Sequence, residues 1–144
     1  MKIKFVRNNE NAITPSRANP RDIGMDLVCI ERYKTLSNGV ILYDTGISVC
    51  PPEGYYIEIV PRSSISKTGW ILANSIGIID PNYTKNLLVA LTRIDSDAKE
   101  MELPFCVSQI VLRKAEYADM DEVERLDEIM SWRVGFGSTG ARIN

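Results

Sequence analysis

Residues 74–83 bring together groups that could recognise a flat polar ligand and activate a water molecule. The run reads Asn-Ser-Ile-Gly-Ile-Ile-Asp-Pro-Asn-Tyr. Isoleucine favours extended backbone, Gly77 admits the close approach of a planar group, and Asp-Pro-Asn is a turn signal. We therefore predict a tight β-hairpin whose backbone N–H and C=O groups, with the Asn74 amide, form a fixed pattern of donors and acceptors that could read a base. Asp80 and Tyr83 lie at its far end, where a carboxylate could activate water.

Residues 61–69, Pro-Arg-Ser-Ser-Ile-Ser-Lys-Thr-Gly, follow a predicted strand and are rich in hydrogen-bond donors. Hydroxyl groups, the Arg62 guanidinium and turn amides could together hold phosphate oxygens. The run matches neither a Walker phosphate loop nor a dinucleotide-binding fingerprint. Ser63 and Ser64 also fit an ordinary serine-rich turn, and Arg62 also fits a structural ion pair. In the same way, Asp80 fits a plain β-turn between two apolar strands.

Two further polar side chains lie at the start of an apolar strand or inside one. Asp26 follows Gly24 and Met25 at the beginning of such a strand. A turn aspartate that caps its own backbone and a metal-binding carboxylate both fit this position. Gln109 lies within residues 107–112, where the pattern predicts a half-buried side chain. Its amide therefore requires a partner, from another strand or from a ligand.

The segment 133–142, Arg-Val-Gly-Phe-Gly-Ser-Thr-Gly-Ala-Arg, is rich in glycine. Glycine-rich terminal segments are commonly flexible tails. A merely flexible tail has no need of Phe136 between two glycines, or of Arg133, Arg142 and two hydroxyl groups beside it. The composition suits a flap that closes over an aromatic, phosphorylated ligand, and we predict a flexible flap over residues 133–144.

The composition predicts one globular domain without a broad surface for nucleic acid. The chain has 144 residues, of which 44% are apolar and 25% charged, and its net charge is −2. These values are typical of a single globular domain. A net charge this small gives no broad electrostatic hold on a nucleic-acid backbone. Histidine is absent, so a carboxylate is the expected general base near neutral pH.

The cysteines and the N-terminus bear on the cellular compartment. Cys29, Cys50 and Cys106 show no paired spacing, which argues against a disulfide framework and against a zinc site. The N-terminal apolar run is too short and too interrupted by charge for a signal peptide, and no run approaches the length of a membrane span. A cytoplasmic protein without a membrane partner fits these features.

Short apolar runs separated by glycine and proline turns predict an all-β fold. In the first strand, residues 2–7, Ile3 and Phe5 share one face, which we expect to be buried. Further strands are predicted at residues 25–30, 39–43, 46–50, 55–60, 70–73, 87–94 and 107–112. No stretch before Lys114 has a helical period. Many short strands in one domain indicate a sandwich, a jelly roll or a small barrel.

Residues 116–128 differ from the rest, with seven acidic residues against one base, Arg125. The near-helical spacing of Met120, Val123 and Leu126 fits a short helix, and a solvated, charged connector fits equally. We expect the β domain to span residues 1–132, with 115–132 as an acidic connecting arm.

Taken in this order, the motifs resemble those of the trimeric deoxyuridine triphosphate nucleotidohydrolases, the dUTPases. The resemblance covers residues 24–140. The five family motifs are matched, in order, by residues 24–27, 61–64, 74–83, 108–109 and 136–140. The resemblance implies a distorted jelly roll of short, mostly antiparallel strands. It also implies the hydrolysis of dUTP to dUMP and pyrophosphate.

The resemblance implies that the third motif binds the base and the sugar and supplies the general base. It implies that backbone groups at Gly77 and Ile79, with the Asn74 amide, receive uracil. Tyr83 would pack under deoxyribose and leave no room for a 2′-hydroxyl. Asp80 matches the family's general base, which deprotonates the water that attacks the α-phosphorus. Backbone groups cannot reverse their polarity, so a mismatched base would leave buried polar groups unpaired.

The resemblance implies that other motifs bind the phosphate groups and contact the metal ion. By resemblance, Arg62, Ser63 and Ser64 bind phosphate as the second motif, and Gln109 matches the fourth-motif glutamine near the α-phosphate. In the family the triphosphate chelates Mg²⁺, and the acid matching Asp26 holds the water shell of the ion. Such binding through substrate phosphates explains why no cluster of protein ligands is visible in the sequence.

The fifth motif implies that Phe136 stacks on uracil. It also implies phosphate contacts from Gly137, Ser138 and Thr139. Arg133 matches the arginine that opens this motif, which usually runs Arg-Gly-x-Gly-Gly-Phe-Gly-Ser-Thr-Gly in the family. The motif here is two residues shorter, and two extended residues span about 7 Å. Either Arg133 reaches phosphate through a rearranged flap, or Arg142 supplies the charge.

The resemblance further implies a homotrimer with three shared sites. Each site would take its third motif from one chain, its second and fourth motifs from another, and its flap from a third. Two alternatives stay open. A dCTP deaminase of the same fold has a similar Arg-Ser-Ser turn, although no matching deaminase glutamate is found here. A module could also bind nucleotide or a partner protein without turnover, although Asp80, Tyr83 and Phe136 are all present.

Overall fold

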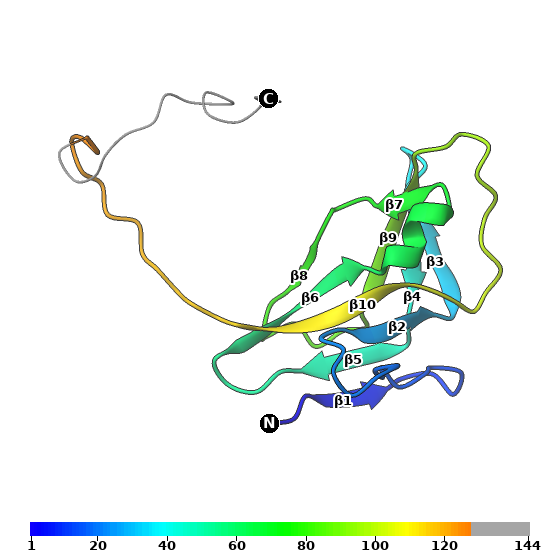
Figure 1. Cartoon of the computed structure of the whole chain (residues 1–144), viewed down its shortest axis with the longest axis horizontal. Helices are drawn as coiled ribbons and strands as arrows, with labels where there is room; N and C mark the ends of the chain where they lie inside the picture. The colour runs from blue at the N-terminus through cyan, green and yellow to red at the C-terminus, as the bar shows by residue number, and fades with distance from the viewer. Residues whose placement is uncertain (128–144) are drawn as a thin grey trace.

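Strands make up nearly all the regular structure of residues 1–127. The computed structural model describes residues 1–127 (Figure 1). The elements in chain order are β1 Lys4–Arg7, β2 Met25–Cys29, β3 Glu31–Thr35, β4 Ile41–Asp44, β5 Ile47–Cys50, β6 Tyr55–Pro61, the 3₁₀ helix η1 Ser63–Lys67, β7 Trp70–Leu72, β8 Gly77–Ile79, β9 Leu88–Arg93 and β10 Phe105–Lys114. The predicted all-β fold of short strands is confirmed.

The strands of residues 1–127 form three sheets in which every pairing is antiparallel. Two sheets have four strands, in the orders β2-β10-β6-β8 and β3-β4-β9-β7, and the third pairs β1 with β5. Strand β10 is central to the first sheet because it pairs with both β2 and β6. This position lets residues that are far apart in the sequence meet along one strand.

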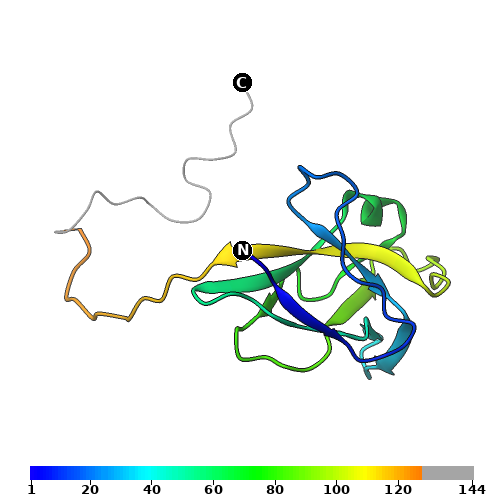
Figure 2. The ribbon, with the colours of Figure 1, turned by 90° about the horizontal axis from the view of Figure 1, so that it is seen from below.

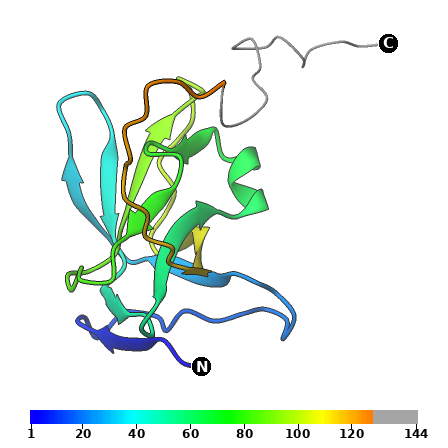
Figure 3. The same ribbon diagram turned by 90° about the vertical axis from the view of Figure 1, so that its left-hand side faces the viewer.

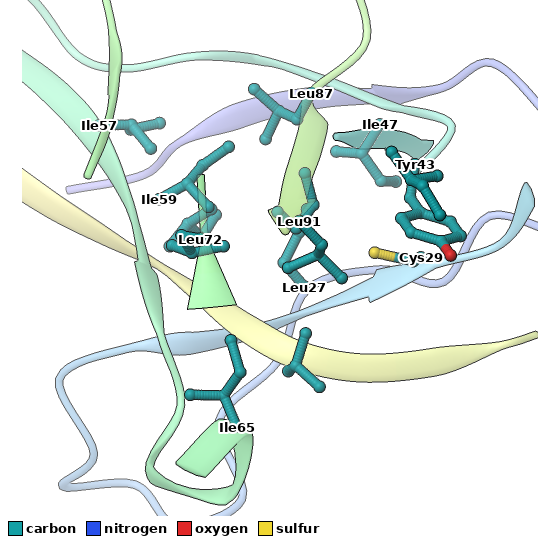
Figure 4. Packing of buried hydrophobic residues seen from close by; sticks show 14 of the residues in the cluster. Leu27, Cys29, Tyr43, Ile47, Ile57, Ile59, Ile65, Leu72, Leu87 and Leu91 are labelled. Carbon is teal, nitrogen blue, oxygen red and sulfur yellow. The ribbon is translucent and has the colours of Figure 1, made fainter. Parts of the chain in front are cut away.

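The core lies where the inner faces of the two four-stranded sheets meet (Figure 4). Leu27 and Ile57 from the first sheet and Leu91 from the second are fully buried. Burial alternates along β4, β6 and β9, as expected for strands with one face against a core. The polar side chain of Thr45 is also buried, and its Oγ1 donates a hydrogen bond of 2.8 Å to the Leu87 carbonyl.

Two details of the strand prediction are wrong. All four residues of β1 are exposed, and Phe5 keeps 44% of its surface in contact with solvent. Of the predicted buried face, only Ile3 is half-buried against the core. Strand β3 was not predicted. Its five residues are exposed and lack apolar alternation, and they become a strand by pairing with β4 in a hairpin (Figure 3). Tertiary pairing therefore overrides weak local preference there.

The predicted hairpin at residues 74–83 is also wrong in its pairing. The segment forms one short strand, β8, which pairs with β6. The preceding strand, β7, belongs to the other four-stranded sheet. The turn between β7 and β8 thus crosses from one sheet to the other, and Ser75 adopts a positive φ of 62° within it. Only the extended backbone and the flanking turns of the prediction are confirmed.

The acidic segment continues from β10 without regular structure. Residues 115–127 contain neither helix nor strand, so the helix interpretation is wrong for the described part of this segment. The segment runs away from the sheets (Figure 2). Its apolar side chains stand in solvent, with Tyr117 83% and Met120 100% exposed. The charged-connector interpretation therefore describes residues 116–127.

The core description can be tested with one buried and one exposed isoleucine. Ile41 is 2% exposed, whereas Ile94 is 65% exposed. We expect Ile41→Ala to lower the free energy of unfolding by about 2–5 kcal/mol, because it removes packed atoms and leaves a cavity. Ile94→Ala should change it by less than about 0.5 kcal/mol. Urea denaturation measures both, and equal losses would contradict this description of the core.

Candidate functional site

The predicted residues Asp26, Arg62 and Gln109 meet at one end of the first sheet. The register places Gln109 of β10 opposite Asp26 on one side and opposite Val60 on the other. Arg62 follows the last residue of β6, and its Nε lies 3.1 Å from Asp26 Oδ1. Its Nη1 donates a hydrogen bond of 3.1 Å to the Cys106 carbonyl. Both members of the ion pair are about one-third exposed, so solvent weakens the attraction, and its main effect is to orient the guanidinium.

Gln109 lies against the glycine of the Gly24-Met25-Asp26 run. Its Nε2 donates a hydrogen bond of 3.1 Å to the Pro61 carbonyl. A Cβ on Gly24 would lie 1.9 Å from Gln109 Oε1. Glycine is therefore required at position 24 for the amide to keep its present position. The sequence left two partners open for Gln109, another strand or a ligand. The structure shows a strand as a partner, through the Pro61 carbonyl.

The two predicted serines lie in η1, directly after Arg62. The backbone of Arg62 is extended, with φ −81° and ψ 153°, and it forms the N-cap of this short helix. Both Ser63 and Ser64 are exposed. One guanidinium and two exposed hydroxyl groups beside it can bind phosphate oxygens.

A second group of predicted residues lies on and around β8. This strand is the edge of its sheet within the described residues, because β6 pairs with only one of its sides. Every second residue of such an edge directs its N–H and C=O away from the sheet. A Cβ on Gly77 would lie 3.2 Å from Ile59 Cβ and 3.5 Å from Asn74 Nδ2. The Asn74 amide therefore lies beside Gly77, and Ile79 is half-buried at the other end of the strand.

Asp80 and Tyr83 lie in the turn that follows β8. Asp80 is exposed, and its carbonyl accepts a hydrogen bond of 3.0 Å from the Tyr83 N–H. The Tyr83 ring packs against the core, and its hydroxyl donates a hydrogen bond of 2.9 Å to the Asn86 carbonyl. Burial raises the pKa of the Tyr83 phenol, and the nearby Asp44 carboxylate raises it further. The hydroxyl therefore stays a donor at neutral pH.

Sequence reasoning missed a polar network beside this turn. The Asn86 Nδ2 donates to both carboxylate oxygens of Asp44, at 3.1 and 3.2 Å, and Asn86 Oδ1 accepts from Asn8 Nδ2 at 2.7 Å. The available signal was positional. Asp44 ends one apolar strand, and Asn86 precedes the apolar run that begins at Leu87.

The two groups of predicted residues do not meet within the chain. Ile79 pairs with Ile57, so Asp80 follows at the level of Tyr56, near the beginning of β6. Arg62 follows the other end of that strand. Position 62 is six residues after position 56, which corresponds to about 20 Å of extended chain. Figure 1 shows β8 approaching the beginning of β6 and η1 lying beyond its end.

The predictions for the flap, which concern Phe136, Arg133, Gly137, Ser138 and Thr139, lie outside the described residues.

The described part of the chain has no ready-made metal cage. Among residues 1–127, no group of three or more carboxylate or thiol side chains gathers in a metal-binding arrangement. Asp26 contributes a single carboxylate, which is already paired with Arg62. That donor set fits an outer-shell contact to a hydrated ion better than direct coordination of a bare one.

Comparison with known proteins identifies the family. The dUTPase family model matches residues 10–140. The deoxyuridine 5′-triphosphate nucleotidohydrolase of Wolinella succinogenes is 32% identical over 141 residues, covering 97% of this chain and 95% of that protein. The protein of the same name from Fusobacterium nucleatum is 34% identical over 143 residues and covers 97% of each chain. This chain belongs to the dUTPase family.

Solved structures show the same fold for this dUTPase-family chain. A mutant dUTPase of Staphylococcus bacteriophage 80alpha with dUpNHpp superposes with a TM-score of 0.74 over 97% of this chain and 99% of the other, at 18% identity. A mutant dUTPase from phage phi11 of S. aureus, described with the coordination of a structural Mg(II) ion, gives a TM-score of 0.71 at 18% identity, over 88% and 99% of the two chains. At identities this low, the similarity shows a shared fold and no more detailed property.

Hydropathy adds one separate finding for residues 1–127. No helix among them is long and apolar enough to cross a membrane.

The contact between Gly24 and Gln109 gives a direct test of the site geometry. We expect Gly24→Ala to lower the free energy of unfolding by about 1 kcal/mol, because the added methyl group displaces the Gln109 side chain and breaks its hydrogen bond to the Pro61 carbonyl. In a Gln109→Ala background the same substitution should cost less than about 0.5 kcal/mol, because the colliding atoms are absent. Denaturation of all four proteins of this cycle gives the comparison. Equal losses in both backgrounds would show that the methyl group collides with something else.

Proposed function

We propose that this chain hydrolyses dUTP to dUMP and pyrophosphate. The observation that carries the proposal is the arrangement around β8. The Asn74 amide lies beside Gly77, the first residue of the strand, and the exposed Asp80 directly follows its last residue. The curated relatives are named deoxyuridine 5′-triphosphate nucleotidohydrolase, which supports the same reaction for this chain.

The edge of β8 suits the recognition of uracil. Uracil offers an acceptor, a donor and an acceptor along one edge, and the backbone N–H and C=O groups at Gly77 and Ile79 have a fixed polarity that can complement it. The Asn74 amide can donate and accept beside them. Cytosine reverses part of this pattern, so its binding would leave buried polar groups unpaired, and such sites reject analogues strongly.

Tyr83 suits discrimination at the sugar. Its ring is held from both ends, because the ring packs against the core and the hydroxyl donates to the Asn86 carbonyl. A ring fixed in this way can lie under deoxyribose and exclude a 2′-hydroxyl group. We therefore assign selection against UTP to Tyr83.

Asp80 is the proposed general base. Its exposed carboxylate can accept a proton from a water molecule while the water oxygen forms a bond to the α-phosphorus. The bond between the α-phosphorus and the bridging oxygen breaks, and pyrophosphate leaves with that oxygen. The chain contains no histidine, so a carboxylate is the side chain suited to this task at neutral pH.

The cluster around Arg62 suits the phosphate groups. Its guanidinium is oriented by Asp26 and by the Cys106 carbonyl, and the Ser63 and Ser64 hydroxyl groups are exposed beside it. Fixed donors of this kind stabilise negative charge that develops on phosphate oxygens. Gln109 would approach the α-phosphate from the same side. For the flap, we propose that Phe136 stacks on uracil and that Arg133, Gly137, Ser138 and Thr139 contact phosphate.

Asp26 is the proposed contact for Mg²⁺. The ion would reach the site on the triphosphate and neutralise part of its charge. The single carboxylate at position 26 can accept hydrogen bonds from the water shell of the ion, which agrees with the absence of a carboxylate cluster among the described residues. Asp26 thereby also links the metal side of the site to Arg62.

We further propose a homotrimer in which each site is shared. Asp80 and Arg62 lie near opposite ends of β6, roughly 20 Å apart along the strand, so one α-phosphate cannot contact both groups of the same chain. In the proposed arrangement, a second chain supplies Arg62, Ser63, Ser64 and Gln109 to the β8 edge of the first. The acidic segment 115–132 would then carry the flap of a third chain to the site.

Uncovered apolar surface supports self-association. The side chains of Phe5 and Ile23 are 44% and 76% exposed. They help to line a groove of about 430 Å³, together with Ile3, Met25, Ile110 and Leu112. Apolar patches of this kind typically mark interaction sites. Coverage by neighbouring chains would also explain why Phe5 is exposed in a single chain.

The assay for the reaction measures pyrophosphate released from dUTP, dTTP, dCTP and UTP with Mg²⁺. We expect release from dUTP alone, and a loss of about 10²–10⁴-fold in kcat for Asp80→Asn, the range for removal of a general base. Asp97→Asn, a matched change at an exposed loop carboxylate, should leave kcat unchanged. Tight dUTP binding without release would favour the binding module, and ammonia from dCTP would favour the deaminase.

Sedimentation tests the assembly. We expect a species of three chains, each of 16.2 kDa, at micromolar concentration, because the exposed faces of β1 and of the acidic segment are covered only by association. A monomer throughout the micromolar range would refute the shared-site arrangement.

A further inference from the structure

The loop between β8 and β9 carries both Asp80 and Tyr83, and the Tyr83 ring packs against the core. Within the loop, the turn from the Asp80 carbonyl to the Tyr83 N–H is closed by one hydrogen bond of 3.0 Å. Beyond this turn, the Tyr83 hydroxyl donates to the Asn86 carbonyl at 2.9 Å. Apart from the packing of the Tyr83 ring, the position of the turn therefore depends on what holds Asn86.

Asn86 is held by contacts from two other parts of the chain. Its Nδ2 donates to Asp44 Oδ1 at 3.1 Å and to Oδ2 at 3.2 Å, at the end of β4. Its Oδ1 accepts from Asn8 Nδ2 at 2.7 Å, and the same Asn8 nitrogen lies 3.0 Å from Ser48 Oγ. Both Asp44 and Asn86 are half-buried. Hydrogen bonds to an ionised carboxylate are stronger than neutral ones, and linked bonds reinforce one another.

The Asp44 carboxylate is itself fixed. Its Oδ1 accepts a hydrogen bond of 2.7 Å from the Gly46 N–H, and the neighbouring backbone is tied to the far end of the loop. Leu87 donates its N–H to the Ile47 carbonyl at 2.7 Å, and the Leu87 carbonyl accepts from Thr45. Asp44 is therefore part of a rigid support rather than a mobile surface acid.

We propose that Asp44 and Asn86 are positioning residues that hold the Asp80–Tyr83 turn in the geometry needed for sugar discrimination and water activation. The inference rests on the proposed function, because it assigns these two residues a task in the same site. Neither residue touches the substrate. They act through the Asn86 carbonyl on the Tyr83 hydroxyl, and through the turn on the Asp80 carboxylate.

Asparagine at position 86 is required by its two neighbours. It must donate to a carboxylate on one side and accept from an amide on the other, and one carboxamide does both. Asn86→Asp removes the donor and sets two carboxylates against each other. Combining Asn86→Asp with Asp44→Asn exchanges the two groups without changing their size. The exchanged pair can again form a donor–carboxylate bond, and the contacts from Asn8 and the Gly46 N–H are retained.

This exchange gives the test. We expect Asn86→Asp to lower kcat/KM for dUTP by about 10–100-fold, because small displacements of reacting groups have costs of this order. The ratio of kcat/KM for dUTP to that for UTP should fall as well, since Tyr83 loses its fixed position. Combining Asn86→Asp with Asp44→Asn should restore both quantities to within about threefold of wild type, because the paired contact is re-formed. Should Asn86→Asp fail to assemble, Asp44→Asn alone should reduce both quantities by a smaller factor.

A merely structural role is separated by a stability control. Ile41→Ala removes core packing and leaves both hydrogen-bonding groups of the Asp44–Asn86 contact unchanged, so it should lower the melting temperature and leave the dUTP-to-UTP ratio at its wild-type value. Two outcomes would overturn the positioning role and leave the proposed function intact. In the first, the dUTP-to-UTP ratio of kcat/KM keeps its wild-type value in both Asn86→Asp and Asp44→Asn. In the second, the double variant is as impaired as Asn86→Asp alone.

Failure of the proposed function would be recognised separately. If the wild-type protein releases no pyrophosphate from dUTP, the contacts among Asp44, Asn86 and Tyr83 can still be tested without substrate, by carbon-13 NMR of the Tyr83 ring. Asp44→Asn should lower the pKa of Tyr83, because the Asp44 charge raises it in the wild type, and Asn86→Asp should shift the resonance. A Tyr83 resonance and titration unchanged in both variants would overturn the inference.

Discussion

The antiparallel register of β6 is the constraint on which the rest of the site depends. On one edge β6 pairs with β8, with Ile57 opposite Ile79. On the other it pairs with β10, with Val60 opposite Gln109. These two ladders place Asp80 near the beginning of the strand and the Arg62 cluster beyond its end. A shift of one residue would turn the buried isoleucines of β6 to the wrong face. Core packing therefore fixes the separation between the proposed base and the proposed phosphate-binding groups.

Each half of the site is stabilised by contacts that suit its task. Around Arg62, an ion pair and one backbone carbonyl orient the guanidinium and leave exposed hydroxyl groups beside it. Around β8, the Asn74 amide lies beside Gly77 on the edge strand of the sheet. Neither half provides both recognition and charge stabilisation alone. A division of the site between chains would make assembly a condition of activity, and it would explain the exposed apolar surface of β1.

The sequence predicted the local features well and the long-range ones poorly. Alternating apolar runs gave most strands, and the motifs gave the candidate residues such as Asp80 and Arg62. The pairing of Asp26 with Arg62 and the contact of Gln109 with Gly24 both depend on β10 lying between β2 and β6. No local sequence pattern encodes that strand order. The same limit explains the missed strand β3 and the wrong hairpin, since β8 takes its partner from β6. Asn86 and Asp44 were missed because each is an ordinary polar residue until the fold brings them together.

The most direct test of the divided site is complementation between two inactive variants. Asp80→Asn chains and Arg62→Ala chains are unfolded together, refolded at equal concentration, and checked for mixed trimers by native mass spectrometry. If each site takes Asp80 and Arg62 from different chains, random assembly restores both groups in about one quarter of the sites, because each contributing chain is intact with a chance of one half. We predict that the mixture regains about that fraction of wild-type dUTP hydrolysis. Mixed trimers with no more activity than the separate variants would contradict the account.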